Sequence, residues 1–515
     1  MLKHTHTQQT CDGATLRDTV QTHLAKVLAS PPFQNTVRLS DFLRYVVRRT
    51  LEGDGDQLKS YAIGVDVFGK PEGFDAASDT SVRVQARKLR ARLDLYYATE
   101  GAHDPVRIVI PRGTYRPSFE MRGAVQPVTL AEQSPVKLHV GRFQNISGDP
   151  RYDYLAQGFE DDIRAALAQF RDLSVLSQPD RADFMVSGTV RSVDTLVRVA
   201  VQVESRADGA VVYTEKFRQA FTAKSLFDVQ EDIAARVAAR VVTTNGVLLS
   251  TQASRGDRQD AALNAHQCRL ELASYLNDPT LAANVSLVQR LEREIRELPD
   301  RSSPLAILSV LYGDDVRASF CQRSEKANIR LSLDAAERAV ALDPRNAVAH
   351  YALFCAQYHA GNFAGYRAAA ERTLELNQSM PDAMASIAFY EAFLGDLDVA
   401  LERMLRAFDL VSQPPPWYFG QMAILRYLRE EYELGLDAIN RVSTPFYNIK
   451  APCKLAILGQ LGPSEALEYT RREVLSDLRT YMDCTQRNAR FYRIPTKTRL
   501  HMMSGIVKAG IKSLF

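Results

Sequence analysis

The sequence predicts a multidomain α+β protein made of three successive segments that differ in pattern. Residues 14–120 read as helices followed by a hairpin, residues 135–250 alternate strands and helices, and residues 260–515 are almost entirely helical. A stretch rich in Pro, Gly and Gln at residues 121–134 is typical of a linker between the first two segments. A chain of 515 residues has room for about two to four domains of ordinary size.

Composition narrows the class of protein. With 46% hydrophobic and 24% charged residues, the chain resembles an ordinary soluble globular protein. The 64 basic residues exceed the 61 acidic ones by only three, which excludes coating of nucleic acid by bulk charge but leaves room for a local basic patch. Six widely spaced cysteines contain no Cys-x-x-Cys pair, so we expect reduced thiols and no metal site. No apolar leader or membrane-spanning stretch is evident, and the expectation is a cytoplasmic chain without stable membrane insertion.

The first segment carries the spacing of three helices and a hairpin. Apolar residues at 39, 42, 43, 46 and 47 mark one helix, and a shorter one fits residues 58–68. A third helix is expected from Asp79, whose carboxylate can cap the first turn, to Tyr97. Residues 106–110 then alternate like a strand, and residues 115–119 return after a turn.

The third helix has two different faces. Its apolar stripe consists of Val82, Ala86, Leu89, Leu93 and Tyr96. A cationic stripe lies beside it, and no acid interrupts residues 81–93. Such a helix can lie in the major groove of DNA, although a solvated basic face remains the alternative. The residues expected to contact DNA are Arg83, Arg87, Lys88, Arg90 and Arg92 on the helix, with Arg112 on the hairpin holding a phosphate.

Three helices followed by a basic-tipped hairpin is the plan of a winged helix-turn-helix. The segment resembles the OmpR/PhoB-type DNA-binding domain in Leu89-Arg90-Ala91-Arg92-Leu93 and in Arg112-Gly113-Thr114-Tyr115. It is still more similar to an N-terminal domain of bacterial regulators fused to repeat arrays, recognised by Phe42–Val47, Tyr61–Gly69 and Val82–Val84. The resemblance implies DNA binding. Residues 16–29 read as a helix where the first family has strands.

The middle segment predicts one mixed sheet covered by two helices. Strands are expected at residues 136–143, 173–176, 184–190, 196–203 and 211–217, and helices at 154–170 and 225–242. The segment resembles the TolB-like N-terminal domain in Phe143–Pro150, Tyr154–Gly158, Val186–Val190 and Leu226–Gln230. That resemblance implies contacts with proteins instead of chemistry.

The last segment contains an internal repeat of 34 residues. Leu342, Leu376 and Leu410 follow this period, as do the pair Gly361 and Gly395. The pattern resembles the tetratricopeptide family, with three good repeats over residues 331–442, and implies an all-α solenoid. Its groove would receive a protein or peptide, unless the helices merely stack. The basic residues 484–515 would either cap the array or form a membrane-surface helix along Leu500, Met503, Val507, Ile511 and Leu514.

Chemistry-bearing motifs are not evident. Residues 64–71 approach a phosphate-binding loop, but Pro71 stands where a hydroxyl should bind magnesium. Proteins with a similar middle segment and repeats often carry a nucleotide cyclase domain, yet no paired metal-binding acids of a cyclase are found. The sequence therefore predicts no enzyme and no cofactor. The expected function is a sequence-specific DNA-binding transcriptional regulator whose repeats bind a partner or signal; the alternative is a non-enzymatic tetratricopeptide scaffold without DNA binding. A homo-oligomer is compatible with either.

Overall fold

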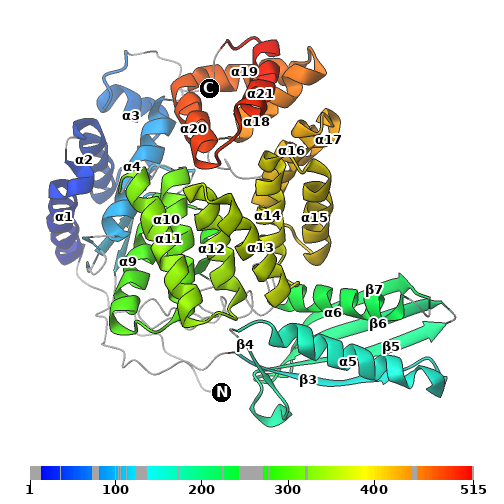
Figure 1. Cartoon of the computed structure of the whole chain (residues 1–515). Coiled ribbons are helices and arrows are strands. Elements are labelled where there is room, and N and C mark those ends of the chain that lie inside the picture. Colours follow the sequence, from blue (N-terminus) through cyan, green and yellow to red (C-terminus); the bar gives the residue numbers. More distant parts are fainter. Residues whose placement is uncertain are drawn as a thin grey trace. The chain divides into compact units, whose positions relative to one another are not determined.

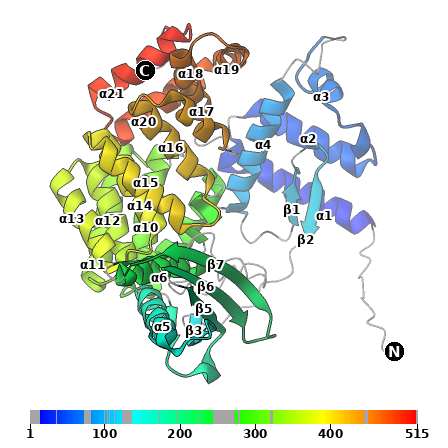
Figure 2. The same ribbon diagram turned by 90° about the vertical axis from the view of Figure 1, so that its right-hand side faces the viewer.

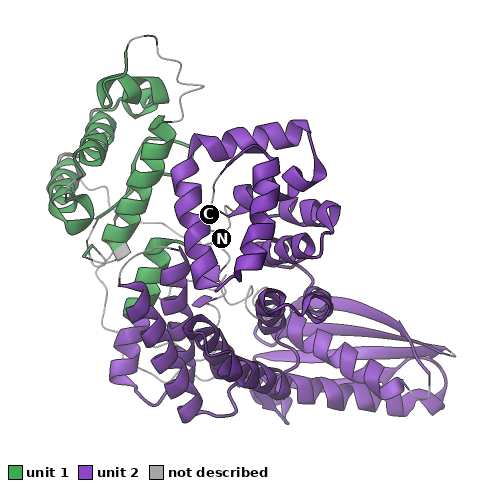
Figure 3. Cartoon of the chain, turned by 45° about the horizontal axis from the view of Figure 1, so that its top comes forward, with its two compact units in different colours: residues 1–128, 280–289 green, residues 129–279, 290–515 purple. Residues whose placement is uncertain are grey.

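The computed structural model separates the chain into two compact units, drawn in different colours in Figure 3. One unit comprises residues 1–128 with 280–289, and the other comprises residues 129–279 with 290–515. The residues that the structure describes are 13–34, 36–71, 73, 81–98, 100–101, 104, 106–111, 113–121, 136–171, 173–193, 195–222, 225–242, 271–272, 274–276, 279–318, 323–442 and 449–512. The chain is a mixed α and β protein with a long helical C-terminal region, as the sequence predicts.

Among its described residues, the first unit contains four complete helices, a two-stranded hairpin and the first part of α9 (Leu281–Glu297). The helices are α1 (Gly13–Ala29), α2 (Val37–Leu51), α3 (Ser60–Asp66) and α4 (Ser81–Ala98), with short 3-10 turns at Pro31–Phe33 and Gly55–Gln57. Strands β1 (Val106–Val109) and β2 (Ser118–Met121) pair antiparallel, with Ile108 opposite Phe119. The cap expected from Asp79 lies outside the described residues.

The returning strand begins later than the predicted residue 115. Tyr115 Oη lies 2.8 Å from Ser60 Oγ of α3, and Arg116 Nη1 donates to Asp56 Oδ1 at 2.7 Å. Tyr115 is therefore tethered to α3 and Arg116 to the 3-10 turn at Gly55–Gln57, and neither pairs with β1.

The core of this unit is built from the predicted apolar stripes. All five residues of the stripe on α4 are buried, with at most 2% of each side chain exposed: Val82, Ala86, Leu89, Leu93 and Tyr96. They pack with buried residues of α2 such as Phe42 and Val46. One side of α4 is thereby fixed against the protein, which leaves the opposite side to solvent.

The α/β part of the second unit is a five-stranded sheet in the order β4-β3-β5-β6-β7. Its strands are β3 (Val136–Asn145), β4 (Leu173–Leu176), β5 (Phe184–Val193), β6 (Leu196–Ser205) and β7 (Val211–Ala220). β3 is parallel to β4 and β5, whereas β5, β6 and β7 are antiparallel neighbours. Helices α5 (Asp153–Ala168) and α6 (Leu226–Val242) cover one face (Figure 1). Burial therefore alternates along β6, as expected for a sheet with one covered face.

The helical region runs through successive antiparallel pairs, seen from two sides in Figures 1 and 2. Its helices are α9 (Leu281–Glu297), α10 (Ser302–Ala318), α11 (Glu325–Leu342), α12 (Ala347–Ala360), α13 (Phe363–Leu376), α14 (Pro381–Leu394), α15 (Leu397–Leu410), α16 (Pro416–Leu428), α17 (Tyr432–Asn440), α18 (Lys450–Leu461), α19 (Glu465–Ser476), α20 (Leu478–Phe491) and α21 (Thr496–Lys508). None of the helices among the described residues is long and apolar enough to cross a bilayer.

The 34-residue period coincides with the helix ends. Leu342, Leu376 and Leu410 are the last residues of α11, α13 and α15. Gly361 and Gly395 end α12 and α14 with φ of 84° and 105°, a left-handed conformation that favours glycine. The sequence repeat therefore reflects a repeated helix pair.

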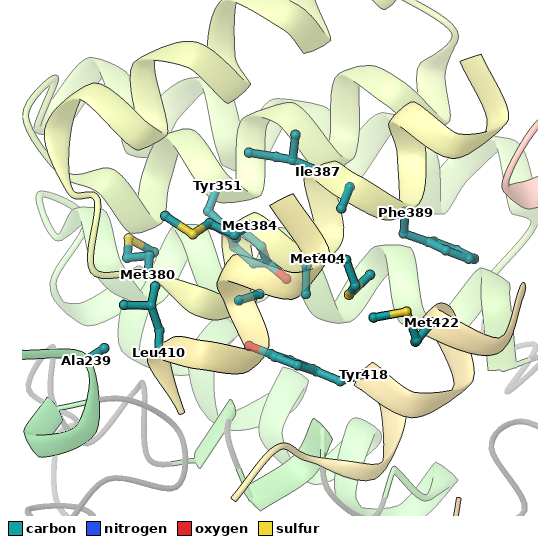
Figure 4. Packing of buried hydrophobic residues seen from close by; sticks show 14 of the residues in the cluster. Ala239, Tyr351, Met380, Met384, Ile387, Phe389, Met404, Leu410, Tyr418 and Met422 are labelled. Carbon is teal, nitrogen blue, oxygen red and sulfur yellow. The ribbon is translucent and has the colours of Figure 1, made fainter. Parts of the chain in front are cut away.

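The α/β part and the helix pairs share one apolar cluster and one charge network. Figure 4 shows Ala239 of α6 beside Leu410 of α15, and both belong to the same buried cluster. At its edge Arg236 Nη2 lies 2.9 Å from Asp232 Oδ2 and 2.8 Å from Asp409 Oδ2. Arg406 pairs with the same two carboxylates. The charges of two arginines and two aspartates therefore neutralise one another where α6 packs against α15.

The C-terminal helix packs through glycine and not through the predicted apolar face. A Cβ on Gly459 of α18 would lie 1.9 Å from the backbone oxygen of Gly505 of α21, so the two helices cross in close backbone contact. Leu500 and Val507, two residues of the predicted apolar face, are 64% and 52% exposed, whereas Ile511 of the same face is buried. Ile506 is 1% exposed and forms the buried side of α21 with Gly505. The contact through Gly505 was not predicted because glycine offers no side chain to mark it.

Candidate functional site

An exposed group of cations lies on α4, opposite its buried stripe. Arg83, Arg87 and Lys88 are all exposed, and within the described part of the chain the structure records no hydrogen bond or ion pair for their side chains. With a rise of about 1.5 Å per residue, Arg83 and Lys88 are separated by about 7.5 Å along the helix axis. We call these three residues the α4 cation group.

Three of the four arginines of α2 differ from this group because each lies near a carboxylate, whereas the exposed Arg38 has no recorded partner among the described residues. Arg44 Nη1 lies 2.7 Å from Asp41 Oδ1, and Arg49 Nη1 lies 2.8 Å from Asp54 Oδ2. Arg48 lies 4.0 Å from Glu52. Among the described residues of this unit, α4 is therefore the helix on which three exposed cations without a recorded partner lie together.

Arg90, also predicted to contact DNA, is half-buried and holds the hairpin. Its Nε donates to Ile110 O at 2.7 Å, and its Nη2 donates to Pro111 O at 3.0 Å and to Thr114 O at 2.8 Å. Hydrogen bonds to three carbonyls fix the guanidinium between α4 and the turn of the hairpin. Its role in this structure is to position the hairpin.

Arg92 has a comparable role at the other side of the helix. Its Nη1 donates to Pro32 O at 2.9 Å, which ties α4 to the turn between α1 and α2. Arg112, expected to hold a phosphate, lies outside the described residues. Sequence spacing placed all the helix cations in one broad stripe. Their contacts divide them into the exposed α4 cation group and two structural arginines, Arg90 and Arg92.

A buried polar network sets the position of α4 against α1. Asp104 is 4% exposed and accepts hydrogen bonds from Tyr96 Oη at 2.5 Å and from Lys26. His23 Nε2 lies 2.9 Å from Tyr97 Oη, and that hydroxyl also accepts the amide of Ile108 at 2.8 Å. Burial lowers the pKa of His23, so its imidazole is neutral near pH 7. Because the network joins α1, α4 and β1, it fixes the helix that carries the α4 cation group.

One exposed apolar residue on the same face was not predicted as part of the site. Val84 is 39% exposed and lies next to Arg83 and Arg87 on the outer side of α4. A valine in an otherwise cationic and exposed stripe can contact the methyl group of thymine. Its position one residue after Arg83 was the signal that could have identified it.

No metal centre accompanies these residues in the described part of the chain. No group of three or more His, Cys, Asp or Glu side chains lies close enough there to hold a metal ion. What the geometry offers is an exposed, unneutralised cationic helix face beside a clamped hairpin.

Comparison with known proteins gives one distant relative. No family model matches the chain. A protein of Rhizobium meliloti (strain 1021) named "Putative adenylate cyclase 3" is 23% identical over 294 residues. The match covers 52% of this chain, and the chain spans about half of the relative's length, 48%. Because the relative's name is that of an enzyme, this finding contradicts the expectation from the sequence that the chain has no enzymatic activity.

Proposed function

We propose that the protein is a sequence-specific DNA-binding transcriptional regulator and that the α4 cation group contacts the DNA. The observation that carries the proposal is the presence on α4 of three exposed cations that have no acidic partner within the described part of the chain. Three of the four arginines of α2 do have acidic neighbours, so this grouping is not repeated on that helix.

The proposed contact places α4 in the major groove. Arg83 and Arg87 would present guanidinium forks to guanine O6 and N7, while Lys88 would hold a phosphate as a point charge. Val84 would supply an apolar contact to thymine. The buried stripe on the opposite side keeps the helix backbone rigid, so little backbone ordering remains for the moment of binding.

The hairpin would contact the flanking backbone, as in a winged helix-turn-helix. Three helices followed by an antiparallel hairpin support this assignment, and Arg90 holds the hairpin turn beside α4. Arg112 at the turn remains the proposed phosphate contact. The resemblances of the middle segment and of the repeats to TolB-like and tetratricopeptide domains support a second role, the reception of a partner or signal.

The test is binding of the full chain to a library of genomic DNA fragments at two salt concentrations. In the Arg83→Ala/Arg87→Ala/Lys88→Ala variant we expect the affinity for enriched fragments to fall at least about 100-fold. The slope of log affinity against log salt should become shallower by about two to three.

A matched control removes three exposed arginines from the helix pairs. Arg338→Ala/Arg372→Ala/Arg441→Ala changes the net charge by the same amount at residues 51%, 45% and 59% exposed. Binding should persist in this variant. Equal losses in both variants would mean that only total charge matters, and absence of binding by the folded, unaltered chain at low salt would refute DNA recognition.

A second candidate activity comes from the similarity to the protein named "Putative adenylate cyclase 3". Formation of cyclic AMP from ATP by the full chain, with Mg²⁺ or Mn²⁺ supplied, would establish it. The product should be measured by chromatography against a heat-inactivated sample. If no cyclic AMP forms above the level of that control, the similarity to the relative does not extend to this activity.

A further inference from the structure

A small cavity lies among the first helices of four successive pairs in the second unit. Its volume is about 90 Å³. Residues of α10, α12, α14 and α16 make up most of its lining, together with Leu276, Ser332 of α11, and Phe491 and Tyr492 at the end of α20. The cavity is therefore bounded mainly by the first helices of the pairs.

The protein's own chain closes this cavity. Arg493 Nε donates to His359 O at 2.9 Å, and Tyr358 Oη donates to Tyr492 O at 3.0 Å. The rings of His359 and Phe491 have centroids 3.9 Å apart. The turn after α20 therefore occupies the space beside α12 where an extended peptide would have to pass, and the remaining room suits a small molecule.

The lining carries no net charge. Arg317 Nε donates to Asp314 Oδ1 at 2.8 Å, and Tyr275 Oη donates to Asp314 Oδ2 at 2.7 Å. Burial, with Arg317 and Arg493 nearby, lowers the pKa of His359 to about 3, so this imidazole is neutral. A charged guest would have to give up its hydration without a counter-charge, which strongly favours an uncharged one.

Two polar atoms of the lining residues have no hydrogen-bond partner in the described part of the chain. Gln421 is 9% exposed, and no described residue donates a hydrogen bond to its Oε1. The Nε1–H of Trp417 is also buried and has no acceptor among the described residues. The two residues are four apart on α16, so their side chains lie on the same face of the helix. The N–H of Trp417, which lacks an acceptor, and the carbonyl oxygen of Gln421, which lacks a donor, are therefore neighbours beside the cavity. Buried polar groups in proteins rarely remain without a hydrogen-bond partner.

We propose that this cavity binds a small uncharged molecule with a carboxamide edge, an N–H donor next to a carbonyl acceptor. The carbonyl accepts from Trp417 Nε1–H, and the N–H donates to Gln421 Oε1. The rings of Tyr390 and Tyr492 lie among the lining and receive the apolar remainder of the molecule. A cavity of about 150 Å³ accommodates benzene, so the smaller volume here suits an aliphatic amide of a few carbon atoms.

Trp417 is the one tryptophan of the sequence, so its fluorescence in the full-length chain reports directly on this cavity. The probe is propionamide, titrated through the millimolar range, with propionate and benzamide in parallel. We expect a saturable change with propionamide, at least tenfold weaker binding of propionate because of its charge, and weaker binding of benzamide because of its size. Free N-acetyltryptophanamide corrects for effects on the fluorophore itself.

A matched pair of variants tests the named contact. Gln421→Met removes the acceptor at nearly constant volume and should weaken propionamide at least tenfold. Gln413→Met makes the same change at an exposed position of the same region and should leave binding unchanged. Circular dichroism establishes that each variant is folded.

Three results would overturn the proposal. They are no saturable change with propionamide in the unaltered chain, equal responses to propionamide and propionate, or equal binding by both glutamine variants. The first result would mean that only water occupies the cavity. Because the experiment contains no nucleic acid, its outcome is independent of the proposed DNA contact.

Discussion

The arginines of α4 and those between α6 and α15 make opposite use of the same side chain. Arg83 and Arg87 are exposed and have no acidic partner among the residues that the structure describes, whereas Arg236 and Arg406 each contact two carboxylates. The first arrangement leaves positive potential available to an external anion, and the second consumes it within the fold. Whether an arginine has a carboxylate or carbonyl partner, more than whether it lies in a basic stretch, therefore separates an arginine that is available to an external ligand from a structural one.

The largest effect on stability is expected at Arg90, a structural arginine on the same helix as the exposed Arg83 and Arg87. Arg90→Ala removes three hydrogen bonds to backbone carbonyls and should lower the stability of the hairpin region by about 2–4 kcal/mol. Arg87→Ala should change it by less than about 0.5 kcal/mol. Hydrogen exchange of peptides from residues 81–121, measured in the full chain, gives both values. Similar protection from hydrogen exchange in Arg90→Ala and Arg87→Ala would contradict the separation of structural from exposed arginines on α4.

A second prediction extends the comparison to a buried histidine in the second unit. The pKa of His359 is about 3 in the folded state, below its usual value of about 6.5, so protons bind preferentially to the unfolded state. Its contribution to stability is present above pH 6.5 and is lost as the pH falls toward 3. The loss between pH 6.5 and 5 should be about 2 kcal/mol.

Denaturant unfolding at these two pH values, followed by Trp417 fluorescence, measures this loss. His359→Gln keeps a hydrogen-bonding group beside Tyr390 and should make the second unit less sensitive to pH. An unchanged pH dependence in His359→Gln would show that other groups dominate acid sensitivity.

The charge network between α6 and α15 should give a smaller effect. Its four side chains are 19–39% exposed, so solvent screens part of their attraction. Arg406→Met should destabilise the second unit by about 1–2 kcal/mol, because Arg236 alone then neutralises the carboxylates of Asp232 and Asp409. A double-mutant cycle with Asp232→Asn should give a coupling near 1 kcal/mol. Additive effects of the two changes would exclude direct pairing.

The smallest effect is expected at the exposed pair on α2. Arg44 and Asp41 are 57% and 50% exposed, and Arg44→Ala should change stability by less than about 0.5 kcal/mol. The stability change caused by Arg44→Ala should depend only slightly on salt concentration. A loss above 1 kcal/mol in hydrogen exchange of α2 would show that surface pairing matters more here than its exposure indicates.

Local pattern predicted most elements but not the partners of individual polar groups. The stripe from Val82 to Tyr96 and the 34-residue helix period follow from apolar spacing and glycine positions, which act over a few residues. The clamp from Arg90 to Ile110 depends on a contact 20 residues away, and the contact of Arg92 with Pro32 spans 60 residues. Spacing within one helix contains no information on such distances.

The cavity of the second unit escaped prediction for a related reason. Its lining includes residues of α10, α11, α12, α14, α16 and α20, so no stretch of sequence displays it as a motif. A weak signal existed in the uncharged run from Asn346 to Tyr366, where His350 and His359 interrupt an apolar pattern. Both imidazoles are buried in the structure, and a buried polar side chain generally marks a network or a site.

The contact between Arg493 and His359 has a consequence for the order of folding. It joins residues 134 apart in the chain, whereas each helix pair forms from neighbours in sequence. Local pairs can assemble before the entropy of closing so long a loop is overcome. The wall of the cavity should therefore be among the last parts of the second unit to form. By the same reasoning, it should be among the first to open when the native state fluctuates.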